Sequence, residues 1–343
     1  MASQAEIAAM RRALDAAREP TQRISPNPRV GCVLLDPTGR ILAVGRHQGP
    51  GTPHAEADAL TLAGPAASGA TAVVTLGPCD HHGRTGPCTD ALIAAGVARV
   101  VYAADDPNPL AAGGTAVLRA AGIDVEGGVL ADAAYALNER WLTAVARSRP
   151  YVTWKYAATL DGRSAAADGT SAWITSPESR RDANCRRAEA DAVVVGTGTV
   201  LADDPRLTVR DDADAPLPYD EQPLRVVVGD REIPDEARVW DDSAPTMQIR
   251  TRDVDSVLVA LHDLEVRHVW LEGGPRLAGA FVAAGVVDEV VGYVAPAFLG
   301  AGATALTDAG IDTISDIRRF TLRDVCRLGP DVRVIARPTQ EEG

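Results

Sequence analysis

The 343-residue sequence predicts an α/β protein of two domains. Short Val- and Ile-rich runs alternate with longer segments whose apolar residues recur at helical spacing, and this alternation is typical of layered α/β folds. The length suits two domains of ordinary size, and a hydrophobic content of 46% is enough to fill both cores. A polar segment at 147–150 that ends in proline interrupts the pattern, so we place the domains at 1–148 and 149–343.

Composition argues against several classes of protein. The formal charge is −13, of which −11 falls after residue 148, whereas a nucleic-acid-binding protein is expected to show a basic face. The most apolar run, 277–306, contains Asp288 and Pro296, which a membrane span does not tolerate. Residues 1–20 predict an amphipathic helix and not a signal peptide. We therefore expect a cytoplasmic protein that acts on small molecules and binds neither nucleic acid nor membrane.

The first domain begins with this amphipathic helix, and a hairpin follows it. The hairpin strands are expected at 30–35 and 41–46, on either side of a turn that contains Pro and Gly. His54 then opens an Ala-rich segment that predicts a second helix. The later elements, in order, are a strand at 71–76, a helix from Cys88, a strand at 99–103 and a helix-strand-helix unit that ends near Arg147.

Four residues of this domain form the pattern of a catalytic zinc site. One imidazole, His54, and two thiols, Cys79 and Cys88, give three ligands, and three protein ligands leave one coordination position open for water. Glu56 stands where a proton shuttle is needed if that water attacks a carbon that bears an amino group. The pattern therefore favours a zinc deaminase. The alternatives are two buried cysteines beside a capping histidine, or a structural zinc with a fourth ligand.

The second domain opens with an alternating strand at 151–156 that carries Lys155, the only lysine among 34 basic residues. Lysine and arginine differ in pKa and geometry, so a site that needs an ammonium group would retain the lysine. Ser176 and Pro177 predict a helix start, with Ser as the cap and Pro at the first helical position. The following elements, in order, are a helix through 187, a strand at 192–196, a glycine loop at 196–205, an acidic surface loop at 211–223, a strand at 224–228, a helix at 254–264, a strand at 266–271 and a hairpin of 320–328 with 332–336.

Gly273 and Gly274 connect the 266–271 strand to another helix. Such a turn can bring backbone N–H groups to a phosphate at the helix N-terminus. Two glycines are also common in ordinary tight turns, and they are not a dinucleotide fingerprint, which needs three glycines at fixed spacing. Taken alone, the sequence of the second domain indicates only an α/β domain that binds a phosphorylated ligand.

Eight segments together resemble one family, the bifunctional deaminase/reductase of riboflavin biosynthesis. They are PNPRVGCV, HAEADAL, TLGPCDHHGRTGPC, DPNP, WKYAATLDGR, TSAWIT, GTVLADDPRLTVR and LEGGPRLAGAF. The resemblance implies a cytidine-deaminase-like three-layer α/β/α domain followed by a dihydrofolate-reductase-like α/β domain. It also implies zinc-dependent hydrolytic deamination of diaminohydroxyphosphoribosylaminopyrimidine, and then NADPH-dependent reduction of the ribosyl side chain of 5-amino-6-(5-phosphoribosylamino)uracil to the ribityl form.

The resemblance further implies roles for individual residues. In the deaminase domain the zinc ligands are His54, Cys79 and Cys88, the proton donor is Glu56, and the substrate contacts are Asn27, His47, His81 and Arg84. In the reductase domain the expected NADPH contacts are Ala158, Trp173, Thr199, Asp203, Gly274, Pro275, Arg276, Leu277, Ala278, Gly279 and Ala280. The expected substrate contacts there are Lys155, Ser171, Arg187, Leu207, Arg210 and Glu272.

Two departures from the family pattern leave an alternative open. Gly77 stands where the family usually has Glu, and Asp58 stands where it usually has a second His. Neither is a zinc ligand, but weaker support around the ligands would give a working reductase with an impaired deaminase domain. A nucleic-acid deaminase and a zinc-stabilised binding protein without turnover are the other rivals. The sequence does not rank Lys155, Asp203 and Glu272 as proton donors in reduction, and the family precedent suggests a homodimer or a larger homo-oligomer.

Overall fold

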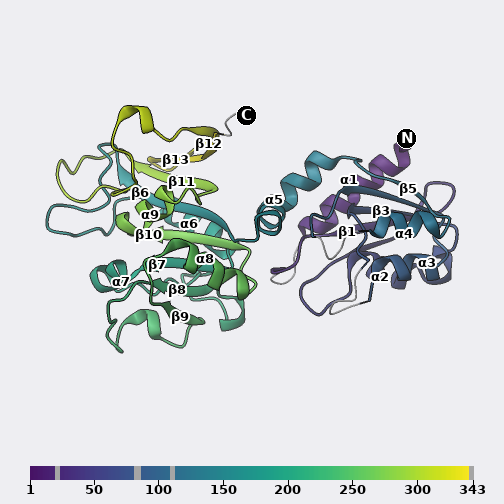
Figure 1. Cartoon of the computed structure of the whole chain (residues 1–343), viewed down its shortest axis with the longest axis horizontal. Coiled ribbons are helices and arrows are strands. Elements are labelled where there is room, and N and C mark those ends of the chain that lie inside the picture. Colours follow the sequence, from purple (N-terminus) through teal and green to yellow (C-terminus); the bar gives the residue numbers. More distant parts are fainter. Residues whose placement is uncertain (20–23, 81–85, 109–112, 340–343) are drawn as a thin grey trace. The chain divides into compact units, whose positions relative to one another are not determined.

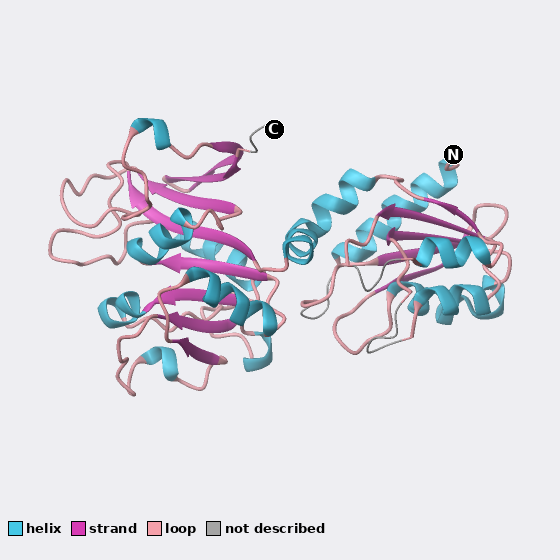
Figure 2. Cartoon of the chain, viewed as in Figure 1, coloured by secondary structure: helices cyan, strands magenta, loops and turns pink. Residues whose placement is uncertain are grey.

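The computed structural model describes residues 1–19, 24–80, 86–108 and 113–339. The chain divides into two compact units, Met1–Ser148 and Arg149–Gly343. Figure 1 shows each unit built around its own sheet, and Figure 2 shows helices on the faces of both sheets.

The first unit contains a five-stranded sheet in the order β2-β1-β3-β4-β5. β1 pairs antiparallel with both β2 and β3, whereas β3, β4 and β5 run parallel. Its strands are β1 (Gly31–Leu35), β2 (Ile41–Arg46), β3 (Thr71–Leu76), β4 (Arg99–Ala104) and β5 (Asp124–Glu126). Its helices are α1 (Gln4–Arg18), α2 (Ala55–Ala63), α3 (Cys88–Ala94), α4 (Gly114–Ala120) and α5 (Ala131–Arg147), with a 3₁₀ turn at Gly64–Ala67.

Alternation along the strands divides this unit into three layers. Val33 and Leu35 lie in the cluster formed with α1 and α5, whereas Cys32 and Leu34 lie in the cluster formed with α2, α3 and α4. Successive strand residues point to opposite faces, so one apolar run contributes to two cores. Gly45 lets α2 approach β2 closely, because a Cβ at that position would lie 2.4 Å from the Ala55 carbonyl oxygen.

The second unit contains an eight-stranded sheet in the order β12-β13-β11-β6-β10-β7-β8-β9. The six strands from β11 to β9 are parallel, and β13 and β12 add an antiparallel edge. Its strands are β6 (Tyr151–Thr159), β7 (Ala192–Gly196), β8 (Leu224–Val228), β9 (Thr246–Ile249), β10 (His268–Gly273), β11 (Glu289–Ala295), β12 (Phe320–Leu328) and β13 (Asp331–Pro338). Its helices are α6 (Pro177–Ala188), α7 (Thr197–Asp203), α8 (Val254–Asp263) and α9 (Pro275–Ala283), with 3₁₀ turns at Tyr219–Glu221, Arg238–Trp240 and Ile314–Asp316.

Helices again cover both faces of this sheet. One buried cluster joins β6, β7, β8 and β10 to α8 and α9, and another joins β7 and β11 to α6 and α7. The carboxyl ends of the parallel strands meet at one edge of the sheet, and binding sites of parallel α/β sheets lie at this edge. None of the helices within the described ranges combines the length and the apolar character that crossing a bilayer requires.

Three elements differ from the sequence-based prediction. The segment after β7 was expected to be a glycine loop, but it forms the helix α7, in which Val200 is buried. Gly198 lowers the helix propensity of this segment, but the helix forms because Val200 packs into the core. β9 and β11 were not anticipated, and β11 adds a central parallel strand beside β6. Its glycine, Gly292, lies against the Tyr156 ring and weakens the strand pattern.

Candidate functional site

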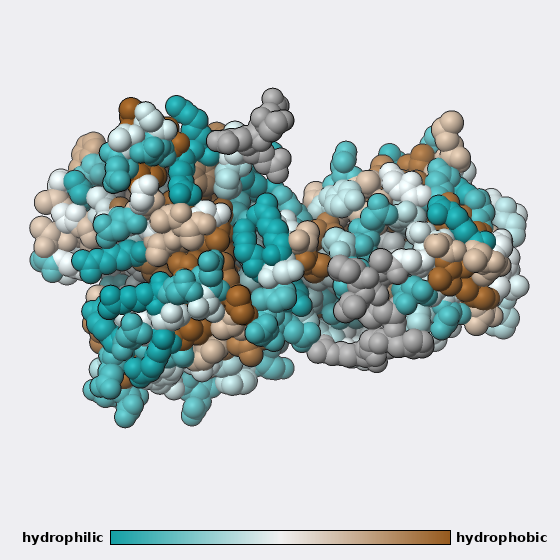
Figure 3. Space-filling model, in the orientation of Figure 1, coloured by the Kyte–Doolittle hydropathy of each residue, from teal (hydrophilic) through white to brown (hydrophobic). Residues whose placement is uncertain are grey.

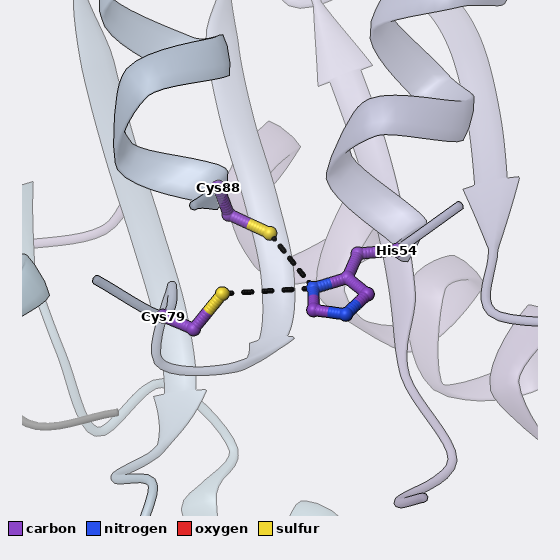
Figure 4. A group of neighbouring side chains, drawn as sticks. All are labelled: His54, Cys79 and Cys88. Carbon is purple, nitrogen blue, oxygen red and sulfur yellow. Dashed lines mark hydrogen bonds between the residues drawn. The ribbon is translucent and has the colours of Figure 1, made fainter. Parts of the chain in front are cut away.

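Three side chains from separate elements converge in the first unit (Figure 4). His54 is the N-cap of α2, Cys79 follows β3, and Cys88 is the first residue of α3. The His54 Nδ1 atom lies 3.2 Å from Cys88 Sγ and 3.6 Å from Cys79 Sγ. The three potential ligand atoms all lie within 4.8 Å of one another.

These distances fit zinc. With Zn–N near 2.0 Å and Zn–S near 2.3 Å, ligand atoms at tetrahedral corners lie about 3.6 Å apart. A hydrogen bond from the Cys88 thiol lowers the pKa of Cys79 to about 4, and a contact with His54 adds to the effect. The same hydrogen bond and burial raise the pKa of Cys88. A divalent cation between the two sulfurs favours the second thiolate as well, so this donor set suits the metal.

Glu56 lies in the first turn of α2 and is only 4% exposed. Burial raises the pKa of this carboxyl from its ordinary value of 4.5, and the nearby Cys79 charge adds to the shift. A carboxyl whose pKa moves towards neutrality can both accept and return a proton during turnover. Its place beside the zinc ligands is therefore chemically suited to proton transfer.

A cavity of about 160 Å³ opens beside these four residues. Of the substrate contacts expected from the sequence, Asn27 and His47 line it, whereas His81 and Arg84 lie outside the described residues. The sequence reasoning did not name the other polar and aromatic residues that line the cavity, which are Asp106, Asn108 and Trp141. Asp106 and Asn108 belong to the DPNP segment, so that motif was an available signal. Trp141 lies on the distant helix α5, and no local pattern marks it.

A chain of hydrogen bonds fixes the ring of His47 in this cavity. The His47 Nδ1–H group donates to the Pro53 carbonyl oxygen over 3.0 Å, so Nε2 accepts from the Asn27 carboxamide over 2.8 Å. Burial lowers the pKa of His47 and favours the neutral ring. In this arrangement the Asn27 NH₂ group is used by the protein, and its Oδ1 atom is the part of the side chain that suits a ligand donor.

The structure accommodates both departures from the family pattern, Gly77 and Asp58, without disturbing the zinc-ligand cluster. Gly77 lines the cavity, and a Cβ there would meet no atom closer than 3.6 Å. Asp58 accepts a hydrogen bond from the backbone N–H of Arg46 over 3.0 Å and so ties α2 to β2. The assembled His54, Cys79 and Cys88 cluster does not favour the impaired-deaminase alternative.

In the second unit a charged cluster lies at the carboxyl ends of β6 and β10. Arg187 from α6 makes a bidentate ion pair with Glu272, at 2.6 and 3.0 Å, and the Trp270 indole N–H donates to the same carboxylate. Burial opposes ionisation, yet the Arg187 and Lys155 charges lower the pKa of Glu272 to about 2. Burial lowers the pKa of Lys155, while the Glu272 charge opposes that shift.

Other expected reductase contacts lie on loops and helix starts near these strand ends. The Ser171 hydroxyl donates to Asp203, and Trp173 is 77% exposed with the Arg180 guanidinium 4.5 Å from its ring centroid. Arg210 pairs with Asp214 at 3.3 Å. Leu207 is buried and has a left-handed backbone with φ 56°, and Ala158 is buried within β6.

The expected cofactor segment forms the start of α9. A Cβ on Gly274 would lie 3.2 Å from Thr199 Oγ1, so α7 and α9 begin close together. Ala278 is fully buried, and a Cβ on Gly279 would lie 1.7 Å from the Thr307 carbonyl oxygen. Pro275, Arg276, Leu277 and Ala280 complete this segment. The structure thus brings the segment and Thr199 together, but it turns Ala278 and Gly279 towards the protein interior.

Comparison with known proteins gives two family matches. Residues 3–104 match the cytidine and deoxycytidylate deaminase zinc-binding region, and residues 150–334 match the RibD C-terminal domain. The two matches account for the deaminase-like and reductase-like folds of the two units.

Whole-chain relatives and structures agree with these matches. The riboflavin biosynthesis protein RibD of Mycobacterium tuberculosis is 52% identical over 311 residues, covering 90% of each chain, and that of Escherichia coli is 42% identical, covering 94% of this chain and 96% of the relative. A structure of Acinetobacter baumannii RibD superposes with a TM-score of 0.89 at 36% identity, covering 98% of this chain and 99% of that one. A Thermotoga maritima deaminase/reductase superposes with a TM-score of 0.85 at 33% identity and the same coverage. This chain therefore belongs to the RibD family of riboflavin biosynthesis enzymes, in which a deaminase and a reductase share one polypeptide.

Proposed function

We propose that this chain performs two successive steps of riboflavin biosynthesis, and that its cofactors are zinc in the first unit and NADPH in the second. The first step is hydrolytic deamination of diaminohydroxyphosphoribosylaminopyrimidine, and the second is reduction of the ribosyl side chain of 5-amino-6-(5-phosphoribosylamino)uracil. The Thermotoga maritima relative bears the names of both activities. The single observation that carries the proposal for this chain is the His54, Cys79 and Cys88 cluster beside a cavity that also contains Glu56.

In the deamination, His54, Cys79 and Cys88 hold the metal and Glu56 moves the proton. Bound zinc acts as a Lewis acid that makes a water molecule a nucleophile at neutral pH. The Glu56 carboxylate accepts a proton from this water and returns it to the departing amino group, so that water and the amine become a carbonyl and ammonia. Asn27 Oδ1 accepts a hydrogen bond from the base, and His47 holds the Asn27 carboxamide in place.

In the reduction, Lys155 is the proton donor. Bound NADPH would supply the hydride for the anomeric carbon of the opened ribose, and one proton from the protein completes the balance. Glu272 is a poor donor because Arg187 and Lys155 keep its carboxylate ionised, and Asp203 accepts a hydrogen bond from Ser171. The Lys155 ammonium group carries the proton, and burial weakens its hold on it.

The remaining contacts with the reductase ligands follow from charge. The sugar phosphate is bound by Arg210 and Arg187. Arg187 uses those N–H groups that do not donate to Glu272 or to the Thr208 carbonyl oxygen. A carboxylate repels a phosphate, so Glu272 is better matched to ribose hydroxyls. Thr199, Trp173 and the start of α9 bind NADPH.

We propose that the protein is located in the cytoplasm, where NADPH is available. We also propose that it forms a homodimer through the antiparallel edge of the sheet in the second unit. β12 is the edge strand of the eight-stranded sheet, and its Leu322 and Val325 side chains are 57% and 54% exposed. Apolar areas lie between hydrophilic residues on the surface of both units (Figure 3). Light scattering of the intact protein should give twice the monomer mass, and Leu322→Glu should reduce it. A monomer in the unsubstituted protein would contradict the proposal.

The two activities are tested with two substrates. With the diaminopyrimidine ribotide and NADPH, the zinc-loaded protein should release ammonia and then oxidise NADPH. With the already deaminated uracil ribotide, it should oxidise NADPH without releasing ammonia. Ammonia release without any NADPH oxidation on either substrate would contradict the reductase assignment. NADPH oxidation on the second substrate alone would contradict the deaminase assignment.

A further inference from the structure

Among the described residues, three side-chain amides form the same pair of hydrogen bonds with the backbone of another residue. In each, the amide oxygen accepts from the backbone N–H of one residue while the amide NH₂ donates to the backbone carbonyl of that same residue. We call this arrangement a carboxamide clamp. The three clamps are Asn138 on Arg29, Gln222 on Val209 and Asn184 on Arg210.

The Asn138 clamp lies behind the deaminase cavity. Asn138 is 5% exposed, and both of its hydrogen bonds to Arg29 measure 2.8 Å. Its backbone, with φ −113° and ψ 16°, departs from helical geometry inside α5. One turn later the Trp141 indole N–H donates to the Pro26 carbonyl oxygen over 2.9 Å. Helix α5 therefore holds the chain on both sides of Asn27, the residue that meets His47 in the cavity.

The other two clamps hold a segment of the reductase domain. Gln222 is 1% exposed, and it bonds to Val209 N–H over 2.8 Å and to Val209 C=O over 3.0 Å. Asn184 from α6 accepts a hydrogen bond from the Arg210 N–H over 3.0 Å and donates one to the Arg210 C=O over 2.7 Å. Both clamped residues follow Leu207, whose backbone is left-handed. The clamped segment therefore contains two of the proposed substrate contacts, Leu207 and Arg210.

We propose that the Asn138 and Gln222 clamps are positioning devices, one for each active site, and this inference rests on the function proposed above. A single hydrogen bond tethers a loop but leaves it free to rotate about that bond. Two bonds to the N–H and C=O groups of one residue fix the direction of the backbone, and hence the direction of the neighbouring side chains. Asn138 thereby aims Asn27 at the base, and Gln222 aims Leu207 and Arg210 at the sugar phosphate.

The chemistry of the clamp gives a matched pair of substitutions. Leucine is close in size to Asn and Gln but neither donates nor accepts hydrogen bonds, so Asn138→Leu and Gln222→Leu remove each clamp without leaving a large cavity. Asn138→Asp and Gln222→Glu keep an acceptor for the N–H group but set a carboxylate against the carbonyl oxygen. If a leucine variant does not fold, the acidic variant tests the same clamp.

The experiment measures both reactions in every variant, so each domain serves as the control for the other. Asn138→Leu should lower kcat/KM for deamination by about 10- to 100-fold, mainly through a higher KM, because small misplacements of binding groups are costly. It should leave zinc content and NADPH-dependent reduction of the deaminated substrate unchanged. Gln222→Leu should do the reverse, raising KM for the deaminated substrate and leaving ammonia release unchanged.

Two core substitutions provide matched controls for stability. Leu142→Ala in α5 and Leu261→Ala in α8 remove buried side chains that belong to no clamp. They should lower the unfolding temperature and leave KM for both substrates unchanged. If the clamp variants behave like these controls, or if either clamp variant impairs both reactions equally, the positioning role is wrong.

A double-mutant cycle identifies the residue through which Asn138 acts. If the clamp works by aiming Asn27, then Asn138→Leu should have almost no further effect on deamination in an Asn27→Ala background. If the reductions in deamination kcat/KM of the two single variants multiplied in the double variant, Asn138 would not act through Asn27. The wild-type rates test the proposed function itself, whereas the variant-to-wild-type ratios test the clamps.

Discussion

Glu56 is the carboxyl that we propose to move the proton in the deamination. Glu56→Gln keeps the size of the side chain but cannot accept a proton, so we expect ammonia release to fall by about 10²- to 10⁴-fold. Zinc content should stay at the wild-type level, because the proposed ligands are His54, Cys79 and Cys88. Ammonia release and metal analysis check this together.

The matched control for Glu56 is another buried glutamate of the same unit. Glu6 is 8% exposed and pairs with Arg99 away from the cavity. Glu6→Gln should destabilise the unit and leave the deamination rate unchanged. Equal rates for wild type and Glu56→Gln would remove Glu56 from the mechanism.

Glu272 gives a prediction about pH and stability. Its pKa is lowered from 4.5 to about 2 in the folded protein, so its ionised form stabilises the fold above pH 4.5, and this contribution is lost as the pH falls towards 2. This lowering of the Glu272 pKa corresponds to a contribution of about 3 kcal/mol to the free energy of unfolding. Glu272→Gln lacks the contribution at every pH, so wild type and variant should differ most above pH 4.5 and converge below it. Urea unfolding of the intact protein, followed by tryptophan fluorescence across this range, measures the difference.

At the scale of elements, the position of α2 determines the zinc site. Gly45→Ala places a methyl group 2.4 Å from Ala55 O and from Ala59 N, which pushes the helix that carries His54 and Glu56. We expect a loss of about 1–3 kcal/mol in unfolding free energy and a fall of about 10- to 100-fold in deamination. Thermal unfolding and ammonia release check the two effects.

Gly77→Ala is the contrasting substitution. Its Cβ would have ordinary contacts of 3.6 Å or more, so stability should change by less than about 0.5 kcal/mol. Deamination should stay close to wild type. If Gly77→Ala strongly reduced the rate of deamination and Gly45→Ala did not, the shape of the cavity wall, and not the position of α2, would limit this reaction.

Local patterns in the sequence predicted those parts of the fold that depend on local physics. The β1–β2 hairpin, α2, β3 and α6 follow from alternation, helical spacing and the Ser176-Pro177 cap, all of which neighbouring residues determine. The segment of α7 was read as a loop because its glycines were weighed without the core that buries Val200.

The same distinction holds for the candidate sites. The convergence of His54, Cys79 and Cys88 was predictable because the His-x-Glu and Pro-Cys patterns are short and chemically restrictive. Asn138 and Trp141 were not, because they lie on α5, more than one hundred residues from the Arg29 and Pro26 groups that they bind. The resemblance implied that Arg187 contacts the substrate, but it did not reveal that Glu272 accepts hydrogen bonds from two nitrogens of the Arg187 guanidinium group.

For the whole molecule, zinc removal should separate the two activities. The proposed metal ligands lie in Met1–Ser148, whereas Lys155 and the Arg187–Glu272 ion pair lie in Arg149–Gly343. Treatment with a chelator should therefore abolish ammonia release and leave NADPH oxidation on the deaminated substrate within about twofold, since the two units have separate cores. Added zinc should restore ammonia release. Loss of both reactions on chelation would mean that the two units fold as one.

Because the sequence contains one lysine, reagents that modify amines have very few targets in this protein. In a chain with 34 basic residues, acylating reagents find one lysine side chain, Lys155, which is partly buried beside Glu272. Arginine is too basic to react with such reagents. Labelling therefore leaves the arginine-rich surface unmodified and reports on the interior of the reductase site. The extent to which a bound nucleotide or sugar phosphate protects Lys155 can be read from the mass of the peptide that contains Lys155, because the exposed Met1 amino group, which also reacts, lies in a different peptide.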